Sequence, residues 1–258
     1  MDPLSQNLLK QFRKLTSKKF RNRENTFIVE GIKLCTEALA STFDIVAMLF
    51  YPALIPSAIQ FQLMQSCAVR NIPCFSIDRQ MLAILSDTVN SQGVIAVVTK
   101  KPVSIDISAI KFAVIIDSAQ DPGNIGTIIR TCDWFGVDCI YLGTGTVELY
   151  NPKVLRSTMG SIFHIPVIDN VEVLQLLRDL KREYFSIYAA DAHGNTDIYS
   201  IKPQNRIALI CGNESLGIND RIEAMADHRI KIPSRGKAES LNVAIAAGII
   251  ISYMAKNA

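Results

Sequence analysis

The stretch that decides the fold is residues 112–134, which read FAVIIDSAQDPGNIGTIIRTCDW. Its first five residues are all apolar, as in a strand that is buried on both faces of a parallel sheet. A turn is predicted at residues 120–124, where Pro122 and Gly123 interrupt regular structure. Residues 125–134 then predict a helix. A buried strand, a polar loop and a helix in this order indicate an α/β protein.

The same alternation of strands and helices extends along the rest of the chain. Strands are predicted at residues 27–30, 44–51, 72–77, 93–99, 139–142, 185–190, 206–211 and 228–232. Helices are predicted at residues 31–40, 57–70, 79–85, 171–182, 218–225 and 241–254. Residues 101–109 are polar and fit neither the helical nor the strand spacing of apolar residues. We therefore expect a linker there, between a domain of residues 1–100 and a domain of residues 110–258.

Composition excludes several protein classes. The chain has 258 residues, of which 49% are hydrophobic and 20% charged, so collagen, coiled coil and wholesale disorder are excluded. Its six cysteines form no C-x-x-C pair and no zinc pattern, which predicts reduced, mostly buried thiols and no metal site. Residues 241–255 are the most apolar stretch, but they are shorter than the roughly 20 residues of a membrane span. Since the N-terminus also lacks a secretory signal, we expect a cytoplasmic protein.

Positive charge is concentrated near the N-terminus. The net charge is only +3, yet residues 1–33 carry eight Lys or Arg against three Asp or Glu. Seven of these cations lie within one stretch that contains no acid: Lys10, Arg13, Lys14, Lys18, Lys19, Arg21 and Arg23. Such a block is typical of contact with nucleic acid, and a solvated helix face is the alternative.

Several familiar catalytic motifs are absent from the sequence. It has no G-x-x-x-x-G-K-[ST], H-E-x-x-H or G-x-S-x-G motif. The nearest approach to a dinucleotide fingerprint starts at Gly143 and Gly145, but position 148 is Glu where the pattern needs Gly. We therefore expect a tight turn there.

Three polar loops that contain glycine follow apolar strands in the second half. Ligands of open α/β sheets gather at this edge, outside the carboxyl ends of the strands. In the first loop Asn124 is placed to cap a helix, and Arg130 lies about one and a half turns into that helix. A plain N-cap and a surface ion pair are the alternatives for these two residues.

The second loop, residues 212–217, begins and ends with glycine and contains Glu214. Glycine lets a ligand approach the backbone, although a simple connection from strand to helix is the alternative. The third loop, residues 232–242, is polar and basic and leads into the most apolar helix, which Ser240 is placed to cap. Asn242 stands at the start of that helix, where we expect it to fasten loops together or to face a ligand.

The three loops closely resemble the three successive motifs of the SpoU (TrmH-like) family of RNA ribose 2′-O-methyltransferases, in the SPOUT superfamily. The stretches that carry the resemblance are DPGNIGTIIRT at 121–131, GNESLG at 212–217 and IPSRGKAESLNVA at 232–244. It covers roughly residues 110–258, and the first hundred residues resemble the L30e-like RNA-binding domain of many members. Trp134 departs from the pattern, because smaller or plain apolar residues are more usual there.

This resemblance implies a catalytic domain with a trefoil knot, a homodimer formed through the last helix, and S-adenosylmethionine as cofactor. It implies that the cofactor lies against the backbone around Ile210, Gly212, Ile232 and Leu241. It places five residues in catalysis: Asn124, Arg130, Glu214, Ser240 and Asn242.

The reaction that the resemblance implies is attack by a ribose 2′-hydroxyl on the sulfonium methyl group. Because guanidinium keeps its proton in proteins, we expect Arg130 to hold the phosphate and polarise the hydroxyl. A phosphate oxygen or Glu214 then accepts the proton. We expect 23S ribosomal RNA as the substrate, with transfer RNA as the alternative, and a knotted RNA-binding protein without turnover as the alternative to an enzyme.

Overall fold

The computed structural model describes residues 1–257, which form two compact units. Unit 1 comprises Met1–Pro102 together with Tyr150–Phe163. Unit 2 comprises Val103–Leu149 and the chain from His164 onward. The division into residues 1–100, 101–109 and 110–258 stays a prediction, but contact places the later segment 150–163 with the first unit.

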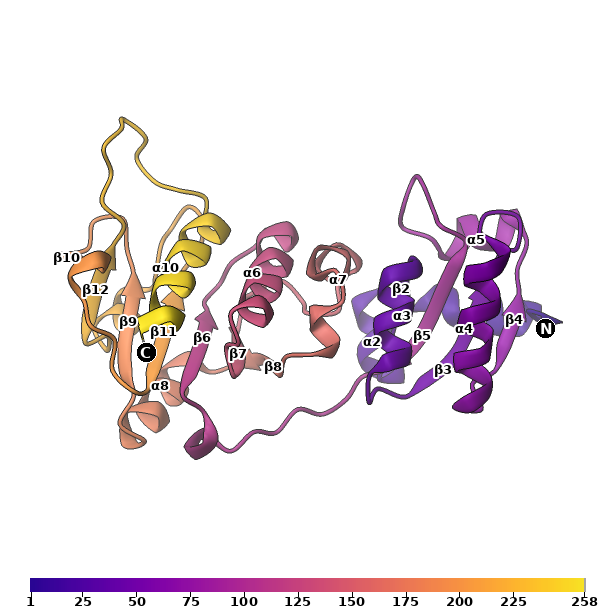
Figure 1. Cartoon of the computed structure of the whole chain (residues 1–258), viewed down its shortest axis with the longest axis horizontal. Helices are drawn as coiled ribbons and strands as arrows, with labels where there is room; N and C mark the ends of the chain where they lie inside the picture. Colours follow the sequence, from indigo (N-terminus) through magenta and orange to yellow (C-terminus); the bar gives the residue numbers. More distant parts are fainter. Residues whose placement is uncertain (258) are drawn as a thin grey trace. The chain divides into compact units, whose positions relative to one another are not determined.

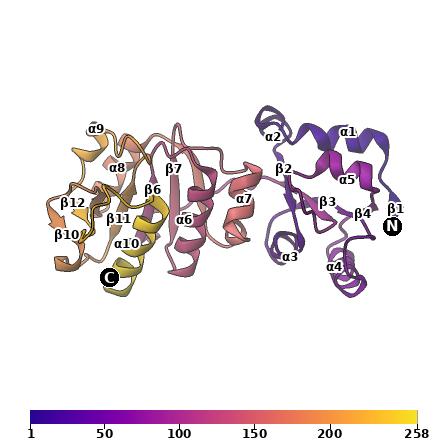
Figure 2. The same cartoon turned by 90° about the horizontal axis from the view of Figure 1, so that it is seen from above.

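Unit 1 is built on a mixed five-stranded sheet. Its strands, in order across the sheet, are β1 (Asp2–Pro3), β4 (Cys74–Ser76), β3 (Ile45–Phe50), β5 (Val94–Thr99) and β2 (Thr26–Glu30). Strand β5 runs antiparallel to both of its neighbours. Helices α1 (Gln6–Lys14) and α5 (Arg79–Leu85) cover one face, while α3 (Ile32–Ala40) and α4 (Ser57–Val69) cover the other (Figure 2). Two further helices complete the unit, α2 (Lys18–Glu24) and α7 (Pro152–Thr158), followed by a 3₁₀ turn at Ser161–Phe163.

Helices α1 and α2 carry the basic block, for which a helix face was only the alternative. Ser5 caps α1 by accepting a hydrogen bond from the backbone N–H of Leu8. Leu9 and Phe12 are buried in the core of unit 1, which fixes one side of the helix and leaves its cations exposed. The basic block is therefore helical.

Unit 2 is a seven-stranded sheet in which every pairing is parallel. Its order is β10 (Thr196–Asp197), β12 (His228–Lys231), β9 (Ser186–Ala190), β11 (Ile207–Cys211), β6 (Phe112–Ile116), β7 (Cys139–Gly143) and β8 (Val167–Val171). Helices α6 (Pro122–Trp134) and α10 (Val243–Asn257) lie side by side on one face, and α8 (Val173–Arg182) and α9 (Asp220–Glu223) lie on the other (Figures 1 and 2). Short 3₁₀ turns occur at Ile107–Ala109 and Ile198–Ser200.

The predicted α/β class and the buried parallel strand are confirmed. All five residues of β6 are buried, because helices cover both faces of the sheet. Strand β6 lies between β11 and β7, so its carboxyl end is near the middle of the sheet edge. This position brings the loop after β6 beside the loop after β11.

Two further predictions concern the state of the cysteines and the absence of a membrane span. All six cysteines are free thiols, and five of them are buried, as predicted. Burial raises the pKa of the Cys139 thiol to about 11, so this residue is not a reactive thiolate. Among the described residues, no helix is both long and apolar enough to cross a bilayer.

Candidate active site

The candidate site lies where β6 and β11 end. The Asp117 backbone N–H donates to the carbonyl of Cys211 at 2.9 Å, which extends the pairing of these strands into the loops. Ser118 then adopts a left-handed conformation with φ 57°, and its carbonyl accepts a hydrogen bond from Asn213 Nδ2 at 2.8 Å. The first two motif loops are therefore tied together at their bases.

Helix α6 begins earlier than predicted, at Pro122, and Asp121 is its N-cap. The Asp121 carboxylate accepts hydrogen bonds from the backbone N–H groups of Gly123 at 2.7 Å and Asn124 at 3.0 Å. The prediction that Asn124 caps this helix is wrong, because Asp121 already satisfies the first free amides. The Asn124 side chain is thereby left to bond elsewhere.

Glu214 links the second loop to the start of α6. Its Oε1 accepts a hydrogen bond from Asn124 Nδ2 at 3.0 Å. Two backbone N–H groups also point at this carboxylate, those of Gln120 and Asp121, each at 3.3 Å. The carboxylate therefore receives three donors from the first loop.

Asn242 brings the third loop into the same cluster. Its Nδ2 donates to Asn124 Oδ1 at 3.0 Å, while its Oδ1 accepts from the backbone N–H of Ala244 at 2.9 Å. Asn242 is thus the residue whose side chain caps α10, and the prediction that Ser240 does so is wrong. The expectation that Asn242 fastens loops together is confirmed.

The hydrogen bonds fix the orientation of both amides. An ionised carboxylate can only accept, so the NH₂ group of Asn124 must face Glu214 and its oxygen must face Asn242. The NH₂ group of Asn242 then faces Asn124, and its oxygen faces the amides of α10. The carboxylate at one end and the backbone N–H groups of α10 at the other therefore set the same direction for the bonds between them.

The environment lowers the pKa of Glu214. Burial by itself raises the pKa of this carboxyl, but the hydrogen bonds from Asn124 and from backbone amides outweigh it and hold the pKa below its ordinary value. Nearby Asp117 behaves in the opposite way, because burial raises its pKa more than the Ser118 hydroxyl lowers it. Glu214 is therefore a weak base that stays charged at neutral pH.

Arg130 lies on the exposed face of α6, six residues after Asn124. At a rise of 1.5 Å per residue this is about 9 Å along the helix axis. Within the described residues the structure gives its guanidinium no hydrogen bond or ion pair, so the alternative of a surface ion pair has no partner there. Arg130 and Ser240 are both exposed, and neither is bonded to the chain of Glu214, Asn124 and Asn242.

The four residues predicted to hold the cofactor have different environments. Ile210 is fully buried in β11, and Gly212 is buried just beyond it. A Cβ on Gly212 would lie 2.4 Å from the backbone C and O atoms of Gly217, so glycine is required for this close turn. Ile232 is half-buried, and Leu241 is exposed.

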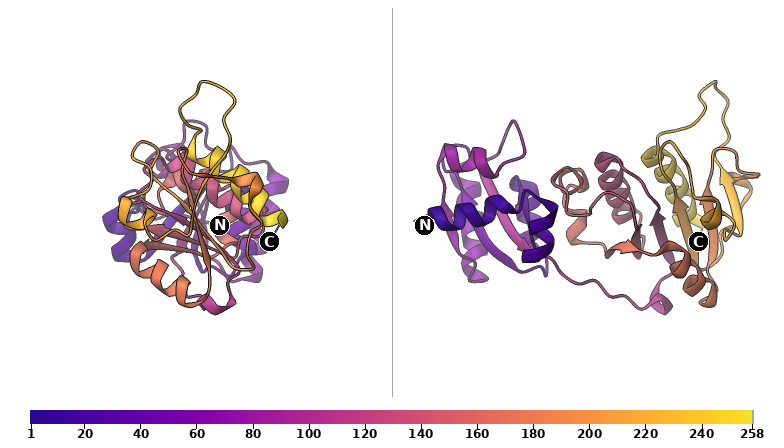
Figure 3. Two further views of the ribbon diagram at one scale, coloured as in Figure 1. Left: turned by 90° about the vertical axis from the view of Figure 1, so that its left-hand side faces the viewer. Right: turned by 180° about the vertical axis from the view of Figure 1, so that it is seen from behind.

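Backbone polar groups next to this turn are available to a ligand. In the described part of the chain, residues 233–241 make no backbone–backbone hydrogen bond, and this loop stands away from the strands (Figure 3). Main-chain N–H and C=O groups are strong donors and acceptors that must be satisfied when they become buried. The loop therefore suits a ligand that is recognised by backbone atoms, as the family cofactor is expected to be.

Two residues of the site were missed by the sequence analysis. Asn213 ties the first two loops together, as described above. Gln120 Nε2 donates to the carbonyls of Ser118 and Gly145, and so joins the loop after β6 to the loop after β7. Neither Asn213 nor Gln120 belongs to a periodic hydrophobic pattern that would mark it. The turn at Gly143 and Gly145, which Gln120 contacts, was considered only as a dinucleotide fingerprint.

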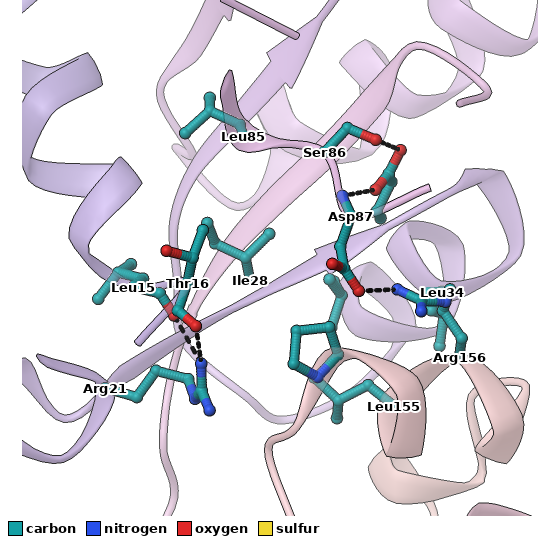
Figure 4. Close-up of a pocket in the computed structure, with 13 residues that line it drawn as sticks. Leu15, Thr16, Arg21, Ile28, Leu34, Leu85, Ser86, Asp87, Leu155 and Arg156 are labelled. Atoms are coloured by element: carbon teal, nitrogen blue, oxygen red, sulfur yellow. Dashed lines mark hydrogen bonds and ion pairs between the residues drawn. The ribbon is translucent and has the colours of Figure 1, made fainter. Parts of the chain in front are cut away.

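The predicted RNA-binding block divides into exposed cations and one buried arginine. Six of its seven side chains are exposed, as a polyanion site requires. Arg21 is the exception, with 4% of its surface exposed, and its Nη1 donates to the carbonyls of Leu15 and Thr16 at 2.9 Å each (Figure 4). The prediction for Arg21 is therefore wrong: it satisfies carbonyls at the end of α1.

The cavity beside Arg21 is too small for a nucleotide. Its volume is about 80 Å³, whereas pockets for small molecules are typically about 300–1,000 Å³. Glu30 and Arg156 line it, but their charges are engaged by Ser86 and Asp87 respectively. The cluster at the ends of β6 and β11 therefore remains the candidate site.

Known proteins resemble the chain along its whole length. It is 34% identical over 247 residues to the 23S rRNA (guanosine(2553)-2′-O)-methyltransferase RlmP of Bacillus subtilis, which covers 95% of each chain. A crystal structure of an AdoMet-bound rRNA methyltransferase from Sinorhizobium meliloti has a TM-score of 0.85 and 27% identity, covering 99% of this chain and 97% of that one. The SpoU methyltransferase AviRb of Streptomyces viridochromogenes, solved with AdoMet, shares the fold with a TM-score of 0.86 at 24% identity, covering 98% of both chains.

Two family models match successive parts of the chain. The model of the MRM3-like substrate binding domain matches residues 6–96. The model described as the SpoU rRNA Methylase family matches residues 111–252, a stretch that includes all three loops of the site. With more than half of its length matched and its motif residues joined by hydrogen bonds, the chain belongs to the SpoU rRNA methylase family.

Proposed function

We propose that this chain transfers a methyl group from S-adenosylmethionine to a ribose 2′-hydroxyl in 23S ribosomal RNA. The observation that carries the proposal is the hydrogen-bonded chain Glu214–Asn124–Asn242, which joins the three motif loops beside Arg130. The relative with 34% identity is named for this reaction on this RNA. Because that relative matches both units, the proposal extends to the substrate as well as the chemistry.

The residues at the ends of β11 and β12 fit the cofactor. Gly212 allows a close turn, and the backbone groups of residues 233–241 make no bonds to other backbone groups of the described chain. When bound there, S-adenosylmethionine supplies an electrophilic methyl group on a sulfonium. Ile210, Gly212, Ile232 and Leu241 would hold it through their backbone and apolar contacts.

Arg130 would hold the RNA. Its planar guanidinium suits bidentate hydrogen bonding to a phosphate, and α6 keeps it at a fixed distance from Asn124. A guanidinium beside the target nucleotide also stabilises negative charge as the 2′-hydroxyl loses its proton. Since positioning of the reactants supplies much of the rate in such transfers, we assign Arg130 as a catalytic residue.

Glu214 would act as a positioning residue. Its carboxylate oxygens already accept hydrogen bonds from three donors of the first loop, so of the two acceptors that the sequence suggests we favour a phosphate oxygen of the RNA. By fixing the amides of Asn124 and Asn242, Glu214 holds the first and third loops in one arrangement. Ser240, exposed two residues before Asn242, would face the substrate.

The exposed cations of the N-terminal helices would bind the RNA backbone. They are Lys10, Arg13, Lys14, Lys18, Lys19 and Arg23, all in the region matched by the substrate-binding model. Phosphate contacts of this kind release counterions, so binding should weaken steeply as salt rises. Their sequence-independent attraction would leave selection of the target nucleotide to other contacts.

A homodimer and a knotted chain belong to the same proposal. Ile245 of α10 and Leu241, two residues before this helix, are exposed at 57% and 47%, which suits a second copy as partner. The family resemblance supports a trefoil knot in unit 2. An enzyme that modifies ribosomal RNA would work in the cytoplasm.

The test is methyl transfer from labelled S-adenosylmethionine to unmodified transcripts of 23S ribosomal RNA and of transfer RNA. We expect label in the 23S transcript. Label confined to transfer RNA would overturn the substrate assignment but keep the chemistry. No transfer to either RNA, by protein that binds the cofactor, would favour an RNA-binding protein without turnover.

A further inference from the structure

Trp134 is the single tryptophan of the chain, and 83% of its surface is exposed. It is the last residue of α6 and follows Arg130 by four positions. Residues four apart on a helix lie on the same face, with Cβ atoms about 5–6 Å apart. The indole therefore stands beside the guanidinium that we assign to the RNA.

This exposure belongs to a well-ordered helix. The opposite side of α6 is buried through Ile125, Ile128, Ile129 and Cys132. The helix continues to its end, where the Phe135 N–H donates to the Thr131 carbonyl at 3.1 Å. Trp134 is therefore held away from the core by a fixed backbone.

The exposed face of α6 combines one cation with one aromatic ring. Between residues 122 and 134 the exposed side chains are Thr127, Arg130 and Trp134. The nearby carboxylate of Asp133 is half-buried and bonded to His164 Nδ1 at 2.9 Å. The face thus presents a positive charge, a hydroxyl and an indole, without an exposed acid.

We propose that Trp134 stacks on an unpaired RNA base next to the nucleotide held by Arg130. This inference rests on the proposed function and names a further substrate contact for it. Sequence-specific RNA recognition uses unstacked bases laid on aromatic side chains, and Arg commonly accompanies them. The two side chains are about 6 Å apart along the helix axis, so one short single strand can meet both.

The charge of this face favours RNA over a second copy of the chain. Arg130 lies one turn from the indole with no exposed carboxylate on α6 to pair with it, so two copies meeting through this face would bring like charges together. The apolar residues suited to a second copy are Ile245 of α10 and Leu241, which lies two residues before that helix. A polyanion that carries aromatic bases matches both side chains of the α6 face.

The first test uses the intrinsic fluorescence of the chain, because all tryptophan emission comes from Trp134. The probes are an oligoadenylate of 12 nucleotides and an inorganic polyphosphate of equal charge, which has no bases. We expect quenching by the oligonucleotide and little change with polyphosphate. Equal emission changes with both probes would overturn stacking. An emission change that depends on protein concentration and not on RNA would also overturn it, because it would place a second copy of the chain on this face.

The second test compares variants in binding and methyl transfer with the unmodified 23S transcript. Trp134→Leu should weaken RNA binding about tenfold and raise KM with little change in kcat, and Trp134→Phe should recover part of the loss. Tyr184→Leu is the matched control, because Tyr184 is 89% exposed after α8, on the other face of the sheet. Wild-type affinity and KM in Trp134→Leu would overturn the inference, whereas absence of transfer by the wild-type chain would overturn the proposed function instead.

Discussion

At the scale of single residues, the site depends on the direction of a few hydrogen bonds. Glu214 can only accept, and this property orients Asn124 and then Asn242. A residue that both donates and accepts could not impose one direction. The charge of Glu214 therefore serves geometry, and its substitution should separate positioning from proton transfer.

Glu214→Gln should lower kcat about tenfold and leave binding of S-adenosylmethionine nearly unchanged. The neutral amide can still accept from Asn124 through its oxygen, but its NH₂ group then faces the backbone N–H of Gln120, so a donor meets a donor. Loss of a general base costs about 10²–10⁴-fold, so a much larger drop with a shifted pH–rate profile would contradict the positioning role. Asp169→Asn serves as control, because Asp169 is an exposed carboxylate of β8.

The same variant should show a pH-dependent difference in stability. Because the folded state holds the pKa of Glu214 below its ordinary value, the carboxylate stabilises the fold at neutral pH. That contribution is lost as pH falls through the lowered pKa. The difference in free energy of unfolding between wild type and Glu214→Gln, measured by denaturant titration, should therefore narrow below about pH 4.

Arg130→Lys should lower kcat about 100-fold with RNA and leave cofactor affinity unchanged. Lysine keeps the positive charge but cannot make the forked contact to phosphate. Single-turnover methyl transfer measures the effect directly. Arg178→Lys is the matched control, because Arg178 is an exposed arginine of α8. Near-normal turnover in Arg130→Lys would refute a bidentate contact of the guanidinium with phosphate.

At the scale of secondary structure, the turn after β11 depends on its first glycine. Gly212→Ala would place a Cβ 2.4 Å from the backbone of Gly217, which cannot move without opening the turn. We expect a loss of about 1–3 kcal/mol in the free energy of unfolding, together with weaker cofactor binding by calorimetry. Gly248→Ala in α10 is the control, since its Cβ would make only an ordinary contact of 3.8 Å with Thr131.

The N-terminal helices should respond differently to substitutions within one basic block. Arg21→Met removes the donor that satisfies the carbonyls of Leu15 and Thr16, so it should lower the free energy of unfolding by about 1–3 kcal/mol.

The double variant Lys18→Ala and Lys19→Ala should leave the free energy of unfolding within about 0.5 kcal/mol of the wild-type value. The double variant should instead reduce the magnitude of the slope of log RNA affinity against log salt concentration, by about 0.7 per lost phosphate contact. An unchanged slope would argue against RNA binding by these two lysines.

Much of this organisation could be predicted from local sequence. The run at residues 112–116 predicted a buried strand because burial on both faces requires apolar residues at every position. The three motif loops were assigned to one sheet edge, where Asn124 joins them by donating to Glu214 and accepting from Asn242. Patterns that repeat along the chain or return as known motifs are visible without a structure.

Other features depend on contacts between distant residues. Asp121 and Asn124 are both good cap residues, and only the path of the loop decides that Asp121 caps α6. Arg21 has the same chemistry as its neighbours, but the fold buries it beneath the end of α1. The segment 150–163 joins unit 1 from far along the sequence, so no local pattern marks it.

At the scale of the whole molecule, the two units offer complementary properties for one substrate. Unit 1 carries the exposed cations of α1 and α2, while unit 2 carries the motif loops and Arg130. Sequence-independent attraction to the RNA backbone is therefore assigned to unit 1, and the chemistry together with the contacts of Arg130 and Trp134 to unit 2.

The central claim is that the methyl group goes to a ribose oxygen, and alkaline digestion of labelled 23S ribosomal RNA tests it most directly. Alkali cleaves RNA through a free 2′-hydroxyl, so a 2′-O-methylated nucleotide survives in a dinucleotide. We predict that the label transferred by the wild-type chain appears in one alkali-resistant dinucleotide and falls about 100-fold with Arg130→Lys. Label released as mononucleotides would show methylation of a base and would contradict the account.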